Sequence, residues 1–260
     1  MNHPSYTTSH IISCPHGFST RLGGVSEGPF ESLNLGRLER GDEPARVAEN
    51  WAILGRALGI DTRRFVHGRQ VHGNCVRIAG REDAHAVTEP APWEGADGYV
   101  TNIPGLPLAV FTADCAPLLL QEPEAGVIGA IHCGWRPVAA DIVKNAVDAM
   151  ASLGAEPRRI RAAIGPGIRR CCFQTGPEVP EALEALLGPE AQKLYGPDPA
   201  QSGKYRVDLP GAVERRLCQL GVLPEHIHQT GECTMCRPEI YWSHRSMGLA
   251  RGSMASVIML

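Results

Sequence analysis

The sequence predicts an α/β (α+β) fold, in which layered, mixed β-sheets are flanked by helices within a single domain spanning residues 1–260. Short apolar segments bounded by Pro or Gly recur through the middle of the chain, as is typical of strands. Amphipathic segments with helical spacing lie before, between and after them. Strands and helices do not alternate strictly, so the pattern does not favour a doubly wound sheet.

The amino-terminal part is predicted to be irregular at first and then helical. Residues 1–14 are expected to be loosely ordered, and residues 15–36, rich in Gly, Ser and Pro, to form a long irregular segment of the kind that is usually functional or disordered. Asp42 is the expected N-cap of the first helix, with Pro44 in its first turn. Gly59 ends this helix, whose apolar positions recur at helical spacing: Val47, Trp51, Leu54 and Leu58.

The rest of the chain predicts a run of strands followed by further helices. A second helix is expected to open at Pro137 and to end at Gly154, with one apolar face. The expected strands are ADGYVTN, LPLAVFTA, APLLLQE, GVIGAIHCG, IRAAIG and the closing ASVIML. PEVPEALEALLG and LPGAVERRLCQLG predict two more helices.

Composition excludes several functional classes. The net charge of −3 gives no electrostatic case for nucleic acid or an anionic membrane. No run of eighteen apolar residues and no secretory signal is present, so we expect a cytoplasmic chain that does not contact a membrane. Nine scattered cysteines are an odd number, which favours reduced thiols over a disulfide framework. Nothing indicates the oligomeric state, and a monomer is expected.

Reactive side chains stand where three predicted strands begin or end. Asp114 and Cys115 follow one strand, His132 ends another, and His72 precedes a third. The strands at Cys115 and His132 are expected to be neighbours in one sheet, which would bring both side chains together. Thiolate and imidazole favour zinc or copper, and three ligands leave one position open, as in catalytic zinc sites. The spacing matches no short ligand motif, so a packed cysteine and hydrogen-bonded histidines remain an open alternative.

Other polar groups have weaker interpretations. Arg136, just before the second helix, either joins an anion site at the helix start or is a surface arginine. The CxxC of Cys233 and Cys236 has no second pair nearby and favours inert thiols, and adjacent Cys171 and Cys172 cannot face one way in a strand. His226 and His228 would share one face of a strand, but a multicopper oxidase needs several such pairs.

Seven motifs, in order and covering nearly the whole chain from about residue 16, resemble one family. They are STRLGGVSEGPFESLNLG, QVHG, ADGYVT, TADCAPLLL, HCGWRP, IGPGI and CT…YWSHR. The series resembles the laccase-domain (polyphenol oxidase-like, YfiH/YlmD-type) proteins, which act as purine nucleoside phosphorylases. The resemblance implies a metal ion, usually zinc with copper as the alternative, held by His72, Cys115 and His132, with His67 as a bystander. It also implies phosphorolysis of adenosine, inosine and S-methyl-5′-thioadenosine, with adenosine deamination alongside.

The sequence departs from the family pattern at three places. Pro137 replaces a usual glycine, and we expect the backbone to be kept because proline suits a first helical turn. The segment Asn50–Ala52 lacks the arginine often found after the asparagine. RRCCFQTG replaces a more usual C-Y-E-V-G, so the pocket wall near Cys172 and Phe173 is expected to differ.

The resemblance suggests roles for the site residues. A phosphate held at the metal would attack the ribose C1′, whereas a water activated there would attack C6 and deaminate adenine. Arg136 would steady the phosphate, and Arg21 and Asn34 would contact ribose or phosphate. Asp114 is expected to orient a neighbouring ligand.

Three other functions remain open at this point. In a metal-free cysteine hydrolase, Cys115 would be the nucleophile and His132 its base, a chemistry that suits editing of peptidoglycan precursors. The second is a copper-dependent polyphenol oxidase (laccase), which the histidine count does not favour. The third is a nucleotide-binding scaffold in which a metal only braces the fold.

Overall fold

The computed structural model describes residues 6–36, 41–89, 93 and 95–260, and their strands form three sheets. The first sheet has the order β1 (Tyr6–Thr7), β2 (His16–Ser19), β15 (Met254–Ile258), β7 (Leu108–Thr112), β3 (Phe65–Val66), β5 (Ala84–His85). The second has the order β14 (Ile227–Gln229), β10 (Arg161–Ile164), β8 (Ala116–Glu122), β9 (Val127–Cys133), β6 (Gly98–Thr101), β4 (Val76–Ile78). A small third sheet contains β11 (Gln174–Thr175), β13 (Tyr205–Val207) and β12 (Tyr195–Pro197).

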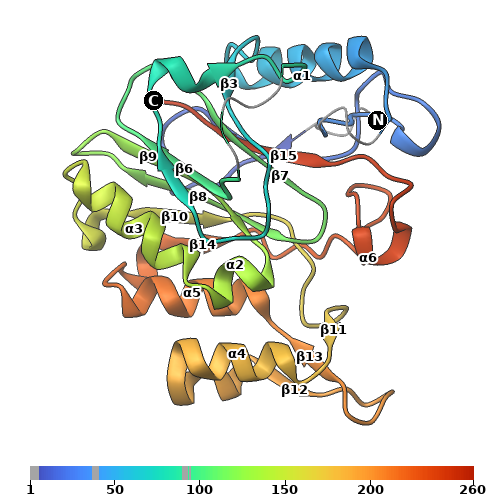
Figure 1. The fold of residues 1–260 in the computed structure, drawn as a ribbon, viewed down its shortest axis with the longest axis vertical. Coiled ribbons are helices and arrows are strands. Elements are labelled where there is room, and N and C mark those ends of the chain that lie inside the picture. The colour runs from blue at the N-terminus through green and yellow to red at the C-terminus, as the bar shows by residue number, and fades with distance from the viewer. Residues whose placement is uncertain (1–5, 37–40, 90–92, 94) are drawn as a thin grey trace.

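Helices cover the outer faces of the two large sheets, as Figure 1 shows. The α-helices are α1 (Pro44–Leu58), α2 (Trp135–Ala139), α3 (Ile142–Ser152), α4 (Glu178–Leu187), α5 (Leu209–Gln219) and α6 (His244–Met247). Short 3-10 turns are η1 (Gly28–Phe30), η3 (Arg81–Asp83), η4 (Pro157–Arg159), η5 (Gly188–Lys193) and η6 (Pro224–His226). In the described part of the chain, no helix is long and apolar enough to span a membrane. The predicted mixed, layered α/β architecture is confirmed.

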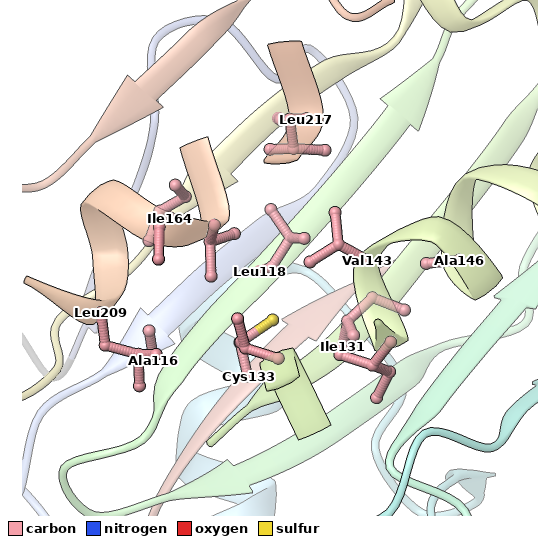
Figure 2. Packing of buried hydrophobic residues seen from close by; sticks show 14 of the residues in the cluster. Ala116, Leu118, Ile131, Cys133, Val143, Ala146, Ile164, Leu209 and Leu217 are labelled. Carbon is pink, nitrogen blue, oxygen red and sulfur yellow. The ribbon is translucent and has the colours of Figure 1, made fainter. Parts of the chain in front are cut away.

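The apolar run of β8 is explained by burial on both faces. Leu118 and Leu120 pack with the helices, together with Ile131 and Cys133 of β9 and Leu217 of α5 (Figure 2). Leu119 points the other way and belongs to the cluster between the two large sheets, because successive side chains of a strand alternate between faces. A strand buried on both sides therefore reads as a continuous apolar segment.

The first helix lies as the sequence predicts, with one change at its start. α1 ends at Gly59, whose φ of 68° is the left-handed conformation that glycine adopts without strain. Its apolar face covers the first sheet, where Trp51 stacks on Phe65 with ring centroids 4.1 Å apart. The N-cap is Glu43 and not Asp42, whose carboxylate instead accepts hydrogen bonds from Ser26 and Asn34 in the preceding loop.

Three further expectations about elements are corrected. The helix predicted from Pro137 to Gly154 is two helices, because Asp141 between α2 and α3 adopts a φ of 63°. Residues 6–14 are not loosely ordered, since β1 pairs with β2, whereas residues 1–5 lie outside the described residues. The segment 15–36 is not wholly irregular, because it contains β2, a buried strand. Pro137 keeps a helical backbone inside the first turn of α2, as expected.

The sequence suggested that the strands around Cys115 are neighbours in one sheet, but the structure places them in two different sheets. β7 belongs to the first sheet, between β15 and β3, whereas β8 and β9 pair in the second. The chain changes sheets between Thr112 and Ala116, and Cys115 lies at this crossing. The thiol is therefore brought to the edge of β9 by the packing of the two sheets as well as by strand pairing.

Candidate metal centre

The structure brings His72, Cys115 and His132 together, and we call these three residues the His–Cys–His centre. Their possible ligand atoms all lie within 4.8 Å of one another, and Cys115 Sγ is 3.9 Å from His72 Nε2. Ligands that bind one zinc ion at 2.0–2.3 Å lie roughly 3.3–3.8 Å apart in a tetrahedron. The donor set and spacing therefore fit a thiophilic ion with one coordination position left open.

Asp97 holds both histidines in place. Its carboxylate is fully buried, and it lies 2.7 Å from His132 Nδ1, which leaves Nε2 of that ring for the centre. The same carboxylate accepts hydrogen bonds from the backbone N–H groups of Val71, His72 and Gly73 at 2.9–3.0 Å. A carboxylate behind a ligating histidine fixes the tautomer and the ring orientation.

The position of His72 depends on Gln70. The Gln70 side-chain amide donates to the carbonyl of Phe111 at 2.7 Å and accepts from its N–H at 2.6 Å, so it pairs with β7 as another strand would. His72 itself has a φ of 58°, a conformation that β-carbon sterics disfavour and that the three hydrogen bonds to Asp97 stabilise. The Q-x-H motif thus joins a loop to the strand that leads to Cys115.

Asp114 anchors the crossing next to Cys115, and its hydrogen bonds join it to later loops. Its carboxylate accepts a hydrogen bond from the Thr234 hydroxyl at 2.7 Å and another from the Arg245 N–H at 2.6 Å. Its carbonyl accepts from the Ile168 N–H at 2.7 Å, and its φ is 91°. Asp114 therefore ties two later loops to the segment that carries Cys115.

The ionisation states of Cys115 and His132 are coupled. Burial alone would raise the pKa of the Cys115 thiol, but the nearby His132 charge and the hydrogen bonds from both histidines lower it. Burial would likewise lower the pKa of His132, but the Cys115 thiolate and Asp97 raise it. The metal-free pair therefore favours thiolate and imidazolium, so a metal ion that binds both residues displaces a proton from His132.

Gly134, the glycine after Cys133, lies so close to the His–Cys–His centre that a side chain at this position would be crowded. A β-carbon added at Gly134 would lie 3.1 Å from Cys115 Sγ and 3.2 Å from His72 Cδ2. Any side chain here would push against two of the three ligands. This contact explains the glycine of the HCGWRP motif, which also forms the N-cap of α2.

Two hollows open on either side of the His–Cys–His centre and share His72, Ala113, Cys115 and Arg251. One, which we call the polar hollow, has a volume of about 340 Å³ and is lined further by Arg69, Gln70, Phe111, Thr112 and Ser253. The other, the apolar hollow, has a volume of about 350 Å³ and is lined further by Trp135, Ile168, Phe173, Leu209, His244 and Arg245. Phe173 thus stands in a pocket wall, in the segment where the sequence departs from the family pattern.

The predicted substrate contacts lie elsewhere. Arg136 is inside α2, exposed, with its guanidinium 4.3 Å from the centre of the Trp135 ring, and it is not among the described residues that line the hollows. Arg21 donates to the carbonyls of Glu31 and Pro238 and covers Trp242. Asn34 is 1% exposed and its amide binds Asp42, Gly36 and Ser253. Arg21 and Asn34 therefore organise loops.

Sequence reasoning missed Asp97 and the cations of the hollows. Asp97 lies in ADGYVT, and an acid at the start of a buried strand is a signal that could have been followed. Arg69 and Arg251 carried no comparable signal, since arginines are usually on the surface. Arg245 lies in the YWSHR motif, but no role was predicted for it.

Among the residues that the structure describes, no other histidine belongs to a group of three or more possible metal ligands. His67 is buried against Phe65 and His85, with ring centroids 4.6 and 3.9 Å away, and so is a core residue, as the Q-x-H register implied. His226 lies in η6, outside β14, and its Nδ1 is 3.0 Å from the Arg158 carbonyl oxygen. His228 lies in β14 and bonds Ser9, so the expected pair on one strand face is not formed.

The CxxC pair that was expected to be inert and the adjacent Cys171 and Cys172 together form a second cluster. Cys171 and Cys172 lie with Cys233 and Cys236, and all four sulfurs are within 4.8 Å of one another. The loop after β10 therefore supplies the second pair of cysteines, Cys171 and Cys172, that is not found near the CxxC motif in the sequence.

Residues 15–260 match the family model described as multi-copper polyphenol oxidoreductase laccase. The chain belongs to this family. A purine nucleoside phosphorylase of Deinococcus radiodurans is 40% identical over 250 residues, covering 96% of this chain and 90% of the relative. The purine nucleoside phosphorylase YlmD of Geobacillus stearothermophilus is 34% identical over 247 residues, covering 93% of this chain and 88% of the relative. The crystal structure of the hypothetical protein YfiH from Bacillus licheniformis is 30% identical and superposes with a TM-score of 0.88, covering 94% of this chain and 92% of that one.

Proposed function

We propose that the chain is a zinc-dependent purine nucleoside phosphorylase that acts on adenosine, inosine and S-methyl-5′-thioadenosine, with adenosine deaminase activity at the same centre. The observation that carries this proposal is the open His–Cys–His centre between a polar and an apolar hollow. The names of the relatives support the reaction class.

The polar hollow suits phosphate. Arg69 and Arg251 supply guanidinium groups, which recognise phosphate with paired N–H donors. Gln70, Thr112 and Ser253 add neutral polar side chains to the same wall. A phosphate here would lie beside Cys115 and His132, where a bound zinc ion would hold it and orient one oxygen for attack.

The apolar hollow suits the nucleoside. Trp135 and Phe173 offer aromatic faces for a purine, and Ile168 and Leu209 suit an uncharged 5′ substituent such as a methylthio group. In phosphorolysis a phosphate oxygen forms a bond to the ribose C1′ while the bond from C1′ to the base breaks, and the base takes up a proton. His244 lines this hollow, and its Nδ1 donates to the Gly248 carbonyl oxygen at 3.0 Å, so Nε2 is the free ring nitrogen and would give the base its proton only from the doubly protonated ring.

One incubation separates the two activities. The purified protein is given each nucleoside with and without phosphate, and the products are identified. Ribose 1-phosphate that appears only with phosphate supports phosphorolysis, and ammonia release from adenosine supports deamination. Absence of both, with zinc bound to the protein, would contradict the proposal. Arg69→Met should raise the KM for phosphate at least tenfold, whereas Arg136→Met, outside both hollows, serves as the matched control.

A cysteine hydrolase is a second candidate, because Asp97, His132 and Cys115 form a chain of acid, base and thiol. His132 Nδ1 is 2.7 Å from Asp97, and the Cys115 pKa is lowered, as a nucleophilic thiol requires. Asp97, and not Asp114, would then be the third member. Amide hydrolysis that persists in metal-free protein and is lost in Cys115→Ser would favour this candidate over the phosphorylase.

A copper oxidase is supported less well. Among the residues that the structure describes, the second group able to bind a metal consists of four cysteines, which is unlike the histidine clusters of coupled copper sites. Dye oxidation that depends on added copper, while nucleoside turnover does not, would assign the oxidase activity to adventitious copper.

A further inference from the structure

We propose that Cys171, Cys172, Cys233 and Cys236 bind a zinc ion in a second, structural site, separate from the His–Cys–His centre. The four thiols come from two loops, one after β10 and one after β14, and all their sulfurs lie within 4.8 Å of one another. We call them the four-cysteine cluster. Four thiolates around one ion complete a tetrahedron and leave no position for substrate, which is the pattern of a structural site.

The sulfur positions fit a metal better than any pairing of thiols. Cys236 Sγ lies 3.5 Å from Cys171 Sγ and 3.4 Å from Cys172 Sγ. Sulfurs bound to one zinc ion at 2.3 Å are roughly 3.8 Å apart, whereas a disulfide requires about 2.05 Å. Cys236 is also nearly equidistant from two adjacent cysteines, so a disulfide would use one of them and leave the other. One zinc ion uses all four.

The backbone around Cys233 has the form of a metal-binding turn. The N–H groups of Arg169 and Cys236 both hydrogen-bond the Cys233 sulfur, as backbone groups do around a sulfur ligand. A CxxC turn directs both of its sulfurs to one side, and here the second pair of thiols faces them from the other loop. Zinc binding replaces the thiol protons of the four side chains and needs no oxidant or reductant.

The position of the cluster shows what the ion would stabilise. Cys233 bridges to Gly167, and the Thr234 N–H donates to the Gly167 carbonyl, so the two loops already meet beside the cysteines. Thr234, within the CxxC, donates its hydroxyl to Asp114, next to Cys115. Phe173, which follows Cys172, lines the apolar hollow. The ion would therefore hold one wall of this hollow and the anchor of the sheet crossing.

Zinc analysis of protein purified without added metal tests the proposal. We expect about two zinc ions per chain in the unmodified protein, about one in Cys236→Ser and about one in Cys115→Ala. Cys218→Ser, a thiol in α5 outside the cluster, is the matched control and should leave the zinc content unchanged. An unchanged zinc content in Cys236→Ser, or a disulfide among the four cysteines in the native protein, would overturn the proposal.

Cobalt spectroscopy keeps the test valid if a cysteine variant folds poorly. In Cys115→Ala, cobalt(II) added to the metal-free protein should give the intense sulfur-to-cobalt charge-transfer bands and the tetrahedral d–d bands of a four-thiolate site. Adding Cys236→Ser should weaken these bands, whereas adding Cys218→Ser should not. Absence of thiolate bands in folded Cys115→Ala would exclude the site. This outcome is independent of nucleoside turnover, so it does not depend on the phosphorylase proposal.

Discussion

Asp97 is the residue on which the two histidine ligands jointly depend. Asp97→Asn would keep the size of the side chain but remove the charge that orients His132 and holds the turn at His72. We expect roughly 10- to 100-fold weaker zinc affinity at the His–Cys–His centre, because partners behind a ligating histidine have effects of this size. Competition with a chelating indicator measures the affinity.

Asp83 offers a matched control for Asp97→Asn, since it is also buried and acidic but bonds Arg77 and lies outside both hollows. Asp83→Asn should lower stability without changing zinc affinity at the centre. If the two variants lose zinc affinity equally, Asp97 acts only through the fold and not through the ligands.

The pH dependence of Cys115 reactivity follows from its partners in the metal-free protein. Burial would raise the thiol pKa, but the His132 charge and hydrogen bonds from both histidines lower it from 9.0 to about 6. A lowered pKa means that the thiolate persists above about pH 6 and is lost below it. Alkylation by iodoacetamide, located by mass spectrometry, should therefore reach half its maximal rate near pH 6 at Cys115. In His132→Asn the midpoint should move upward by at least one pH unit, and an unchanged midpoint would contradict the assigned cause.

At the level of single residues, the members of the His–Cys–His centre could be predicted through the family motifs, whereas the roles of the residues around them were not predicted. His132 lies in a strand, Cys115 just before one and His72 in a loop, and the ordered motifs of the family, not the spacing, singled them out as a group. Asp97, Arg245 and Arg251 act through contacts that only the packed chain creates, such as the hydrogen bonds that Asp97 accepts from the turn at His72. Four scattered cysteines likewise become a cluster only when β10 and β14 pair.

Among the elements, the break between α2 and α3 depends on Asp141. Its φ of 63° disfavours a side chain, but its carboxylate binds Arg216 of α5 at 2.6 and 2.9 Å. Asp141→Gly should remove only this ion pair, whereas Asp141→Ala should also carry left-handed strain and be about 1 kcal/mol less stable than the glycine variant. Urea unfolding of both variants measures the difference. Equal stabilities would show that the strain is relieved by rearrangement.

The same element shows where periodicity misleads. The apolar positions of Val138, Ile142, Val143 and Ala146 continue at helical spacing across the break, because both helices cover the same face of the second sheet. Periodicity records which face is buried, but it does not record a single left-handed residue. The helices α1, α4 and α5 could be predicted from the sequence because a Gly or Pro residue marks an end of each helix near the predicted position.

At the scale of the molecule, the sequence predicts layers more readily than it predicts which strands share a sheet. β7, β8 and β9 follow one another along the chain and read alike, yet β7 pairs with β15, the last strand. This pairing joins segments separated by about 150 residues, and nothing in local hydrophobicity specifies it. The sequence pattern therefore could not predict that Cys115 lies at a crossing between sheets, although it did predict that Cys115 lies close to His132.

The His–Cys–His centre should stabilise the whole fold, because its ligands join the two large sheets. Cys115 lies between β7 and β8, His132 belongs to β9, and the loop of His72 is tied to β7 through Gln70. Zinc at 1,000 times its Kd would stabilise metal-free protein by about 4 kcal/mol at this centre if it binds only the folded state. Chemical denaturation with and without zinc should show this gain, and Cys115→Ala should lose most of it while Cys218→Ser retains it. Equal zinc-induced gains in the two variants would mean that the gain comes from zinc bound elsewhere, such as at the four-cysteine cluster, and not from this centre.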